Sequence, residues 1–336
     1  MVSKDSDPTH GFYKHQFNIA DIVGAGVFWD FPQLGYDEEA LILTGNQFNA
    51  TPAYIGSTVI FFPKHLLYAN LPFDFCFFQG APWNVGTIAP PIVLDQGPYT
   101  TLATAVADPN NFIRVYKFVG TSRACPTSLG SNDIATTIFT PPDAEQPGSG
   151  PCPNANCLET GDGRFQNAGT QSGEPDVPSG SAVRFWQVRV DSDSGFSTPF
   201  SYKINADTLT VEESCEFFAD ISSFDFNPSI VANEAGTIFV TWSSTDPVNG
   251  LNAQVRTSGK LSGDLCTVAQ SGLLVNQSTN PLTGNFDAVL GHQRWGDYSA
   301  ITLDPADHTK AYGVNEKVRN GDSTSWKTYF FNAHNP

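Results

Sequence analysis

The sequence predicts an all-β protein whose strands form a β-propeller of roughly five to seven blades with long inter-strand loops. Three observations support this fold class: the composition, a series of short strand-like runs, and a weak internal repeat. The 336 residues include 29 Gly, 24 Pro and 26 Phe but a single Met. This composition is typical of short strands joined by tight turns and is poorly suited to long helices.

Short runs of alternating or β-branched residues mark the individual strands. They include EALILTGNQF and AVRFWQVRV, and in chain order they span residues 39–48, 57–64, 112–119, 182–190, 237–244 and 310–318. Clusters of Asp, Asn, Gly and Pro separate the runs, and no segment has the period and length of a long helix. This spacing is typical of a sandwich, a barrel or a propeller.

The internal repeat favours the propeller. Residues 29–48, 224–244 and 296–318 each begin with an acidic and an aromatic residue, continue as an apolar strand, and turn into a second strand. Residues 161–190 form a looser fourth copy with a longer insert. Because one such unit cannot bury both of its faces alone, several units are expected to stack around a central channel.

We expect residues 1–336 to form a single propeller domain, in which 121–182 is a long loop-rich insertion. That segment contains the run PPDAEQPGSGPCPNANC, in which turn-forming residues dominate. A linker between two domains is the alternative interpretation. The six cysteines allow three disulfides, and the spacing of Cys152 and Cys157 is suited to closing a small loop.

The charge and the apolar segments restrict the partners. The formal net charge is −17 at pH 7, which disfavours nucleic acid because its phosphates need Lys and Arg to neutralise them. No apolar run is long enough to span a membrane, and no signal peptide is visible. We expect an extracellular or periplasmic monomer that acts on a small molecule or carbohydrate and binds neither nucleic acid nor a membrane.

Four strings resemble those of a known group of proteins. The strings VSKDSDPTHGFYKHQFN, WDFPQLGYDEEALILTGNQF, LETGDGRFQNAGTQSG and RWGDYSAITLDP are similar to strings in exported bacterial β-propeller proteins often called sialidase-like. The resemblance spans most of the chain and implies a propeller fold, but the group has no settled activity to carry over. In that group the first string lies well inside the propeller. The resemblance therefore implies that one or two N-terminal blades are lacking, or that the ring closes differently.

Acidic and amide side chains recur where the repeated units begin, and in a propeller these positions face the channel. Carboxylates that converge on one axis repel one another unless a positive charge lies between them. Calcium is a suitable ion because it accepts about six to eight oxygen ligands in loose geometry. The expected calcium ligands are Asp30, Asp162, Asn167, Asp225, Asn227 and Asp297.

Two alternatives need no metal. Arg164 or Arg294 would neutralise the ring of carboxylates and form a structural salt-bridge collar around the channel. Each aspartate would otherwise only cap its own turn, since Asp before a turn readily accepts a hydrogen bond from the amide two residues on.

The expected function is calcium-dependent hydrolysis of small esters or lactones. A channel calcium would polarise the carbonyl and stabilise the oxyanion, with a neighbouring carboxylate or His292 as general base. The candidate catalytic residues are Asp297, Asp30, His292 and Arg294. Aromatic residues beside the acidic positions would wall a pocket or stack on a sugar ring, although packing between blades is the alternative. The candidate substrate-binding residues are Arg164, Trp295, Tyr298 and Trp29.

Other functions stay open. A glycoside hydrolase or lyase would use two carboxylates, for which Asp297 and Asp30 are the candidate pair. A sialidase would need an arginine cluster and repeated S-x-D-x-G-x-T-W boxes, but only one degraded match occurs, at residues 191–199. A non-catalytic extracellular propeller that binds glycans or proteins is favoured by the absence of the common nucleophile, zinc and nucleotide motifs.

Overall fold

Antiparallel meanders follow one another along the chain in the computed structural model, which describes residues 1–336 except 96, 107–110, 123–124, 174–181 and 335–336. We call the five meanders blades 1 to 5. Blade 1 consists of β3 (Phe28–Tyr36), β4 (Ala40–Phe48), β5 (Tyr54–Pro63) and β6 (Cys76–Phe78). Blade 2 consists of β7 (Pro91–Val93) and the meander β8 (Thr100–Val106), β9 (Phe112–Val119) and β10 (Thr127–Ala135). β7 belongs to a different sheet from this meander, and an isolated bridge between Ala89, just before β7, and Ala103 of β8 connects the two.

Blades 3 and 4 are four-stranded meanders, and blade 5 has three strands. Blade 3 consists of β11 (Gly169–Gly173), β12 (Val183–Asp193), β13 (Phe196–Asn205) and β14 (Thr210–Glu216). Blade 4 consists of β15 (Phe224–Ala232), β16 (Ile238–Asp246), β17 (Leu251–Lys260) and β18 (Leu273–Gln277). Blade 5 consists of β21 (Ala300–Asp304), β22 (Asp307–Val318) and β23 (Trp326–His334).

The smaller elements lie outside the blades. The two helices and the two 3₁₀ turns are short, and two pairs of two-residue strands form small ladders of their own. These elements are β1 (Val2–Ser3), η1 (Pro8–His10), β2 (Phe12–Tyr13), α1 (Ala20–Val23), α2 (Lys64–Tyr68), η2 (Cys266–Val268), β19 (Phe286–Asp287) and β20 (His292–Gln293). No helix within the described ranges is long and apolar enough to cross a membrane.

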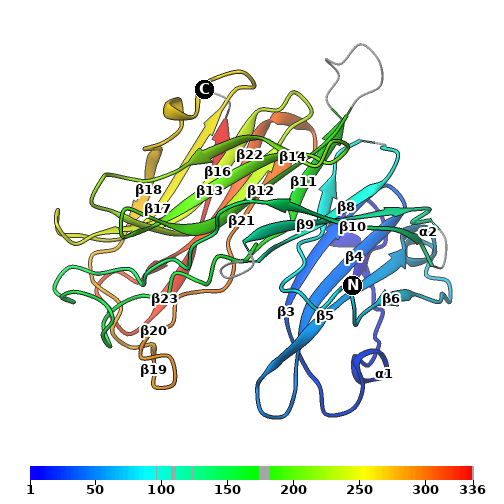
Figure 1. Ribbon diagram of the computed structural model, residues 1–336, viewed down its shortest axis with the longest axis horizontal. Helices are drawn as coiled ribbons and strands as arrows, with labels where there is room; N and C mark the ends of the chain where they lie inside the picture. The colour runs from blue at the N-terminus through cyan, green and yellow to red at the C-terminus, as the bar shows by residue number, and fades with distance from the viewer. Residues whose placement is uncertain (96, 107–110, 123–124, 174–181, 335–336) are drawn as a thin grey trace.

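The first strands of the blades lie side by side, as in a propeller. β7 pairs in parallel with both β3 and β11, which joins blades 1, 2 and 3 at their inner strands. β15 packs on blade 3, and β21 packs on β15. Figure 1 shows blades 1 and 2 in one half of the molecule and blades 3 to 5 in the other. The strand order confirms the prediction of an all-β propeller.

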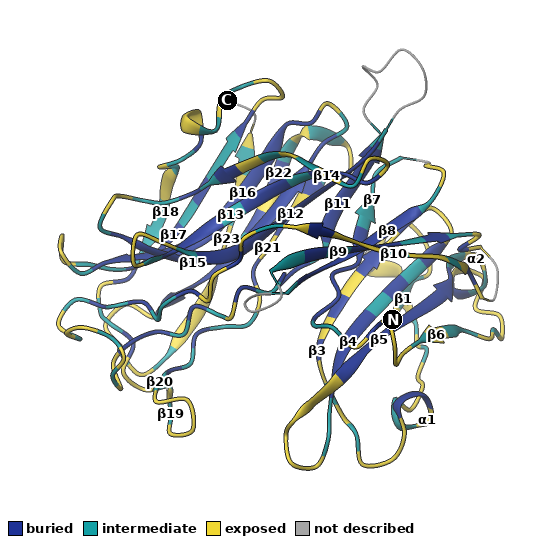
Figure 2. Cartoon of the chain, viewed as in Figure 1, coloured by how far each residue is buried: buried dark blue, intermediate teal, exposed yellow. Residues whose placement is uncertain are grey.

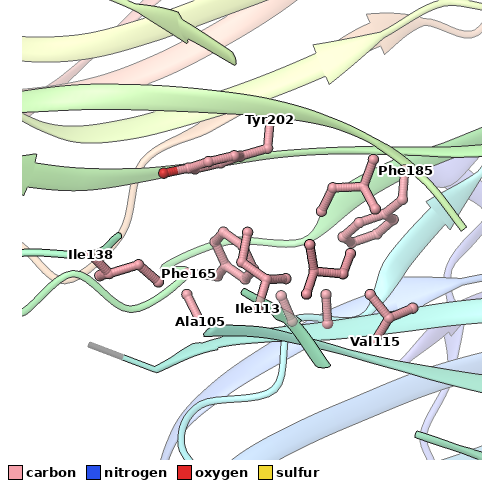
Figure 3. Packing of buried hydrophobic residues seen from close by; sticks show 11 residues of the cluster. Ala105, Ile113, Val115, Ile138, Phe165, Phe185 and Tyr202 are labelled. Atoms are coloured by element: carbon pink, nitrogen blue, oxygen red, sulfur yellow. The ribbon is translucent and has the colours of Figure 1, made fainter. Parts of the chain in front are cut away.

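The core lies between successive blades. Between blades 2 and 3, Ile113 and Val115 of β9 pack with Phe185 of β12 and Tyr202 of β13 (Figure 3). Similar clusters join blades 1 and 2, blades 3 and 4, and blades 4 and 5. Each large apolar side chain that is fully buried in this way contributes about 1.5–3 kcal/mol. Figure 2 shows the buried residues concentrated on the strands inside these layers.

Blade 1 differs from the others in what covers its second face. There, Ile60 and Phe62 of β5 pack with α1, with Val2 of β1 and with Leu67 of α2. Among the described residues no core cluster joins blade 5 to blade 1. Instead, these two blades meet at the stacked rings of Phe31 and Tyr298.

The repeated segments predicted from the sequence are the first hairpins of the blades. Residues 29–48 form β3 and β4, residues 224–244 form β15 and β16, and residues 296–318 contain β21 and β22. In the first two copies a β-bulge follows the acidic residue, with a φ of 54° at Phe31 and 50° at Asn227. A bulge redirects side chains at a strand end, so these positions leave the regular alternation of the sheet.

The segment 121–182, expected to be a loop-rich insertion, contains two blade strands, β10 and β11. β10 is a largely exposed edge strand of mixed polar residues, so it lacks the apolar alternation that marks the other strands. The expected disulfide between Cys152 and Cys157 is confirmed. The other two pairs are Cys76–Cys125 and Cys215–Cys266.

Candidate functional site

The segments that lead into β11 and β21 lie side by side at one end of the blades. A parallel bridge pairs Leu158 with Gln293. The Glu159 amide donates to the Gln293 carbonyl at 3.0 Å, and the Gln293 amide donates to the Cys157 carbonyl at 2.8 Å. Because side chains alternate along such a pairing, Glu159 and Arg294 project to the same side.

Arg294 binds two carboxylates. Its Nε lies 2.8 Å from Oε2 of Glu159, and its Nη2 donates to Oδ1 of Asp297 at 3.0 Å. Burial raises the pKa of Glu159, and the positive charge of Arg294 opposes that shift. Arg294 therefore fixes the positions of two acidic side chains that come from different blades.

Arg164 is the second cation of the site. Its Nε donates to Oδ1 of Asp162 at 2.6 Å, and its Nη2 pairs with Oδ2 of the same carboxylate. The guanidinium lies over the ring of Phe31, 5.1 Å from the ring centroid. The other partner of Phe31 is Tyr298, whose ring is stacked at 5.2 Å with an interplanar angle of 18°. Loops of blades 1, 3 and 5 meet in this stack.

Tyr298 lies close to two carboxylates. Burial, with the charges of Asp297 and Asp30, raises the pKa of Tyr298 to about 12. The phenol therefore stays protonated near neutrality and can donate a hydrogen bond. Its side chain is 43% exposed, which leaves part of the ring accessible beside the carboxylates.

Glu316 is the acidic residue that the sequence did not reveal. It lies on β22 and is 7% exposed. Its carboxyl group packs against Gly296, where a Cβ would meet Oε1 at only 1.6 Å. Burial raises the pKa of Glu316 to about 7, the charge of Asp297 adds to the rise, and a hydrogen bond from the Gly296 amide opposes it. Glu316 belongs to no sequence motif. The sequence indicated it only through its place in the repeat that begins at Gly296.

His292 is oriented by a second residue that the sequence did not reveal. Its Nδ1 lies 2.8 Å from Oδ2 of Asp143. Its Nε2 is buried and has no hydrogen-bond partner within the part of the chain that the structure describes. His292 is close enough to Glu159 for its charge to lower the pKa of that carboxyl group.

A pocket of about 360 Å³ opens beside Arg164. Its polar walls are held by internal hydrogen bonds, from Nδ2 of Asn46 to Oγ1 of Thr87 and between the hydroxyls of Tyr54 and Ser57. The lining residues are Asn46, Phe48, Tyr54, Val85, Gly86, Thr87, Ala105, Val106, Asp162 and Arg164. The pocket thus combines neutral polar groups with apolar and aromatic ones next to the carboxylates.

Two of the expected substrate-binding rings are packing residues. Trp295 is 4% exposed, and its ring lies 5.6 Å from that of Phe226 within a core cluster. Trp29 packs in the cluster on the second face of blade 1, with its ring directly over Gly45. Trp295 is buried and Trp29 is partly buried, which supports the packing alternative, and neither lines the pocket.

Asp225, one of the expected metal ligands, has its side chain inside blade 4. Its Oδ1 accepts from Nε1 of Trp242 at 2.8 Å and from the Ala219 amide at 3.1 Å, and Oδ2 accepts from Ser223. The side chain is fully buried, and burial raises its pKa to about 7. Its oxygens are engaged within the blade.

The two expected amide ligands tie blades together. Nδ2 of Asn167 donates to the Pro228 carbonyl at 2.8 Å, which links the inner ends of blades 3 and 4. Nδ2 of Asn227 donates to Oδ1 of Asn315 at 3.2 Å, which links blades 4 and 5. Arg164 pairs with Asp162 and Arg294 pairs with Asp297, which are ion pairs of the kind that the salt-bridge alternative to calcium requires.

The four aspartates expected to bind calcium are not gathered into one compact group. In the described ranges, the only group of three or more acidic, histidine or cysteine ligand atoms within 4.8 Å of one another is Glu213, Cys215 and Cys266. Those two cysteines are bonded to each other. Asp30, Asp162, Asp225 and Asp297 therefore form no such group in the described ranges, and calcium binding stays a prediction.

The fold and the site define an all-β propeller protein with an acidic site held by paired arginines. No family model matches the sequence, and no curated protein matches it either. Solved structures with a loose likeness include a thermostable family-43 glycoside hydrolase, with 11% identity, 91% of this chain and 88% of that chain covered, and a TM-score of 0.37.

Two further structures have a similar likeness. An endo-arabinase from Bacteroides thetaiotaomicron has 11% identity, 90% and 93% coverage, and a TM-score of 0.38. An α-L-arabinofuranosidase from Podospora anserina, solved with cellotriose, has 13% identity, 93% and 92% coverage, and a TM-score of 0.40. At these TM-scores the likeness is too loose to assign a fold or an activity.

Proposed function

We propose that this protein is a hydrolase of neutral glycans, with Glu316 as general acid and Asp297 as the partner carboxylate. The observation that carries the proposal is the placement of the Glu316 carboxyl group against Gly296, directly beside Asp297 in sequence. Two carboxyl groups are thereby held together in different environments, one buried and one paired with Arg294.

The two environments suit the two roles in glycosidic cleavage. The acid must carry a proton to the leaving oxygen near neutrality, and the pKa of Glu316 is raised to about 7 by its burial. The partner carboxylate must face the developing positive charge on the sugar or activate a water. Asp297 is half exposed and is oriented by Nη2 of Arg294 at 3.0 Å, so it can reach a ligand at the surface.

Asp30, the partner of Asp297 expected from the sequence, is less suited to the acid role. It is exposed near the start of β3, whereas Glu316 is buried. Its negative charge helps to raise the pKa of the Tyr298 phenol. We assign Asp30 to the wall of the site, beside the stacked rings.

The charge balance favours a neutral substrate. Arg164 is paired with Asp162, and Arg294 is paired with Glu159 and Asp297, so both cations are already engaged. Carboxylates outnumber guanidinium groups at the site, and a substrate carboxylate would be repelled. This arrangement does not favour a sialidase, which needs free arginines for an acidic sugar.

The test is hydrolysis of neutral glycans by the wild-type protein and two variants. We expect Glu316→Gln and Asp297→Asn to lower kcat/KM by about 10²–10⁴. Glu316→Gln should lose least on aryl glycosides with good leaving groups, because these need little protonation. Glu38→Gln, at an exposed position between β3 and β4, is the matched control. Full activity of Glu316→Gln, or no hydrolysis of any neutral glycan by the wild type, would refute the proposal.

A hydrolase of small esters or lactones is the second candidate. The observation that favours it is the Asp143–His292 pair, which orients an imidazole as a general base would be oriented. Comparing lactone turnover in the wild type and in His292→Gln separates the two functions, because glycan hydrolysis by Glu316 and Asp297 does not require that base.

A further inference from the structure

Three aromatic residues of blade 5 lie exposed on the face that turns away from blade 4. Residues of β22 and β23 alternate, and Ala311, Phe331 and Ala333 belong to the cluster packed against blade 4. The opposite face carries the three exposed aromatic residues. Their exposed fractions are 50% for Tyr312, 76% for Phe330 and 50% for Trp326.

The strand register connects these rings to the proposed acid. Glu316 pairs with Thr328, which lies two residues from Trp326 on one side and two residues from Phe330 on the other. Two residues along a strand span about 7 Å. Side chains two apart share a face, so the rings and Glu316 are on the same side of blade 5. Tyr312 continues the row, four residues before Glu316 on the same strand.

The chemistry of this face fits a sugar chain better than a protein partner. The residues beside the rings include three exposed neutral hydrogen-bonding groups, Thr302, Thr328 and Asn332, together with the small apolar residues Ala300 and Val314. Tyr312 is held in place by a hydrogen bond from its hydroxyl to Oδ2 of Asp304 at 3.2 Å. Sugar rings present flat C–H faces that pack on aromatic rings and hydroxyls that pair with such groups. A surface that binds another protein would present a more continuous apolar patch.

We propose that Trp326, Phe330 and Tyr312 bind an extended chain of neutral sugars that leads along blade 5 to Glu316. The substrate class is then a polysaccharide and not a small glycoside. We call these three residues the aromatic strip. This inference rests on the proposed function of the same site, because the strip leads to a cleavage site only if Glu316 acts on the sugar chain.

The binding experiment uses Glu316→Gln in the full-length protein, so that no probe is consumed. Mobility is measured in native gels that contain soluble xylan, arabinan, galactan or glucan. We expect at least one of these polysaccharides to retard the protein. Adding Phe330→Ala or Trp326→Ala should weaken the retardation about tenfold, which corresponds to the loss of one good contact. Adding Tyr68→Ala, at a 51% exposed tyrosine of α2, should leave it unchanged.

The outcomes separate the inference from the proposed function. Retardation that depends on the rings supports the strip even if the wild type cleaves none of the four polymers. Cleavage by the wild type with retardation that survives both alanine variants overturns the strip and leaves the function standing. No retardation by any polymer also overturns it. A dimer in sedimentation equilibrium that Phe330→Ala dissociates would overturn it as well, because a second copy would then cover this face.

Discussion

The carboxyl group of Glu316 lies against the backbone of Gly296, with Oε1 1.6 Å from the point where a Cβ at position 296 would stand. Only glycine leaves room for the carboxyl group there. The glycine in the string RWGDYS therefore has a function in the structure: it admits an acid from β22 next to Asp297, the residue that follows it in the chain.

Gly296→Ala should separate the two carboxyl groups while leaving the blade intact. The added methyl group forces the Glu316 side chain away, and a misplacement of this kind costs about a hundredfold in activity. Overpacking should also cost about 1–3 kcal/mol of unfolding free energy. Glycan hydrolysis and thermal unfolding are the measurements. Gly97→Ala is the control, because the nearest atoms to its Cβ are at an ordinary 3.6 Å. Unchanged activity in Gly296→Ala would show that the position of Glu316 does not matter.

The activity should depend on pH through Glu316. As general acid it must be protonated, and its pKa is raised to about 7 by burial, with a contribution from the charge of Asp297. We expect kcat/KM to be lost as the pH rises through about 7, since this parameter reports the groups of the free enzyme. Asp297→Asn removes the negative neighbour and should move the basic limb to lower pH in the residual activity. A basic limb that stays in place would assign the acid to another group.

The same group makes stability depend on pH in a defined direction. The ordinary pKa of this carboxyl group is 4.5, and in the folded protein it is about 7. The folded state therefore binds more protons between these values, and the unfolding free energy falls as the pH rises from 4.5 to 7. The loss is on the order of 3 kcal/mol for a group this buried. Glu316→Gln should flatten that part of the stability profile in urea titrations. Asp225, whose pKa burial also raises to about 7, should keep some of the slope in the variant.

The sequence predicted the first hairpins of blades 1, 4 and 5 and, more loosely, that of blade 3, because each begins with an acidic and an aromatic residue followed by an apolar strand. The copies at 29–48, 224–244 and 296–318 all correspond to consecutive strand pairs. The polar edge strand β10 was not predicted, since an exposed edge needs no apolar alternation. The site was predicted less completely than the strands because its residues follow no local sequence pattern. Side chains such as Glu316 and Asp143 act through contacts with residues distant in the chain, and no local pattern encodes those contacts.

Asp225 lies in β15 at the expected place in the repeat, but its carboxyl group is bound within blade 4, and calcium binding stays a prediction. The sequence shows that Asp225 and Asp30 occupy related places, but not which way each side chain turns. In the structure Trp242 and Ser223 donate to Asp225 within the blade, whereas Asp30 is exposed at the start of β3. Residues that match in a repeat can therefore have different partners when the neighbouring strand differs.

The disulfide between Cys215 and Cys266 should contribute strongly to the stability of blade 4. It joins β14 to η2 across 51 residues, and Cys215 lies in the core cluster between blades 3 and 4. Closing a loop of this length is worth about 4 kcal/mol in the chain-entropy model. We expect the double alanine variant to lose about this much in urea titrations. Removing the Cys152–Cys157 pair, which closes a far shorter loop, should cost less. An equal or larger loss for the short loop would contradict this ordering.

The Phe31–Tyr298 stack should hold blades 1 and 5 together, since no core cluster joins them in the described part of the chain. The rings are 5.2 Å apart, and Arg164 lies over Phe31 at 5.1 Å. Removing one ring of such a pair costs about 1 kcal/mol beyond the lost area. Tyr298→Ala should therefore speed amide hydrogen exchange in β3 and β21 and raise KM for glycans. Tyr298→Phe retains the ring and serves as the control. Exchange that is equally slow in both variants would show that other contacts close the ring.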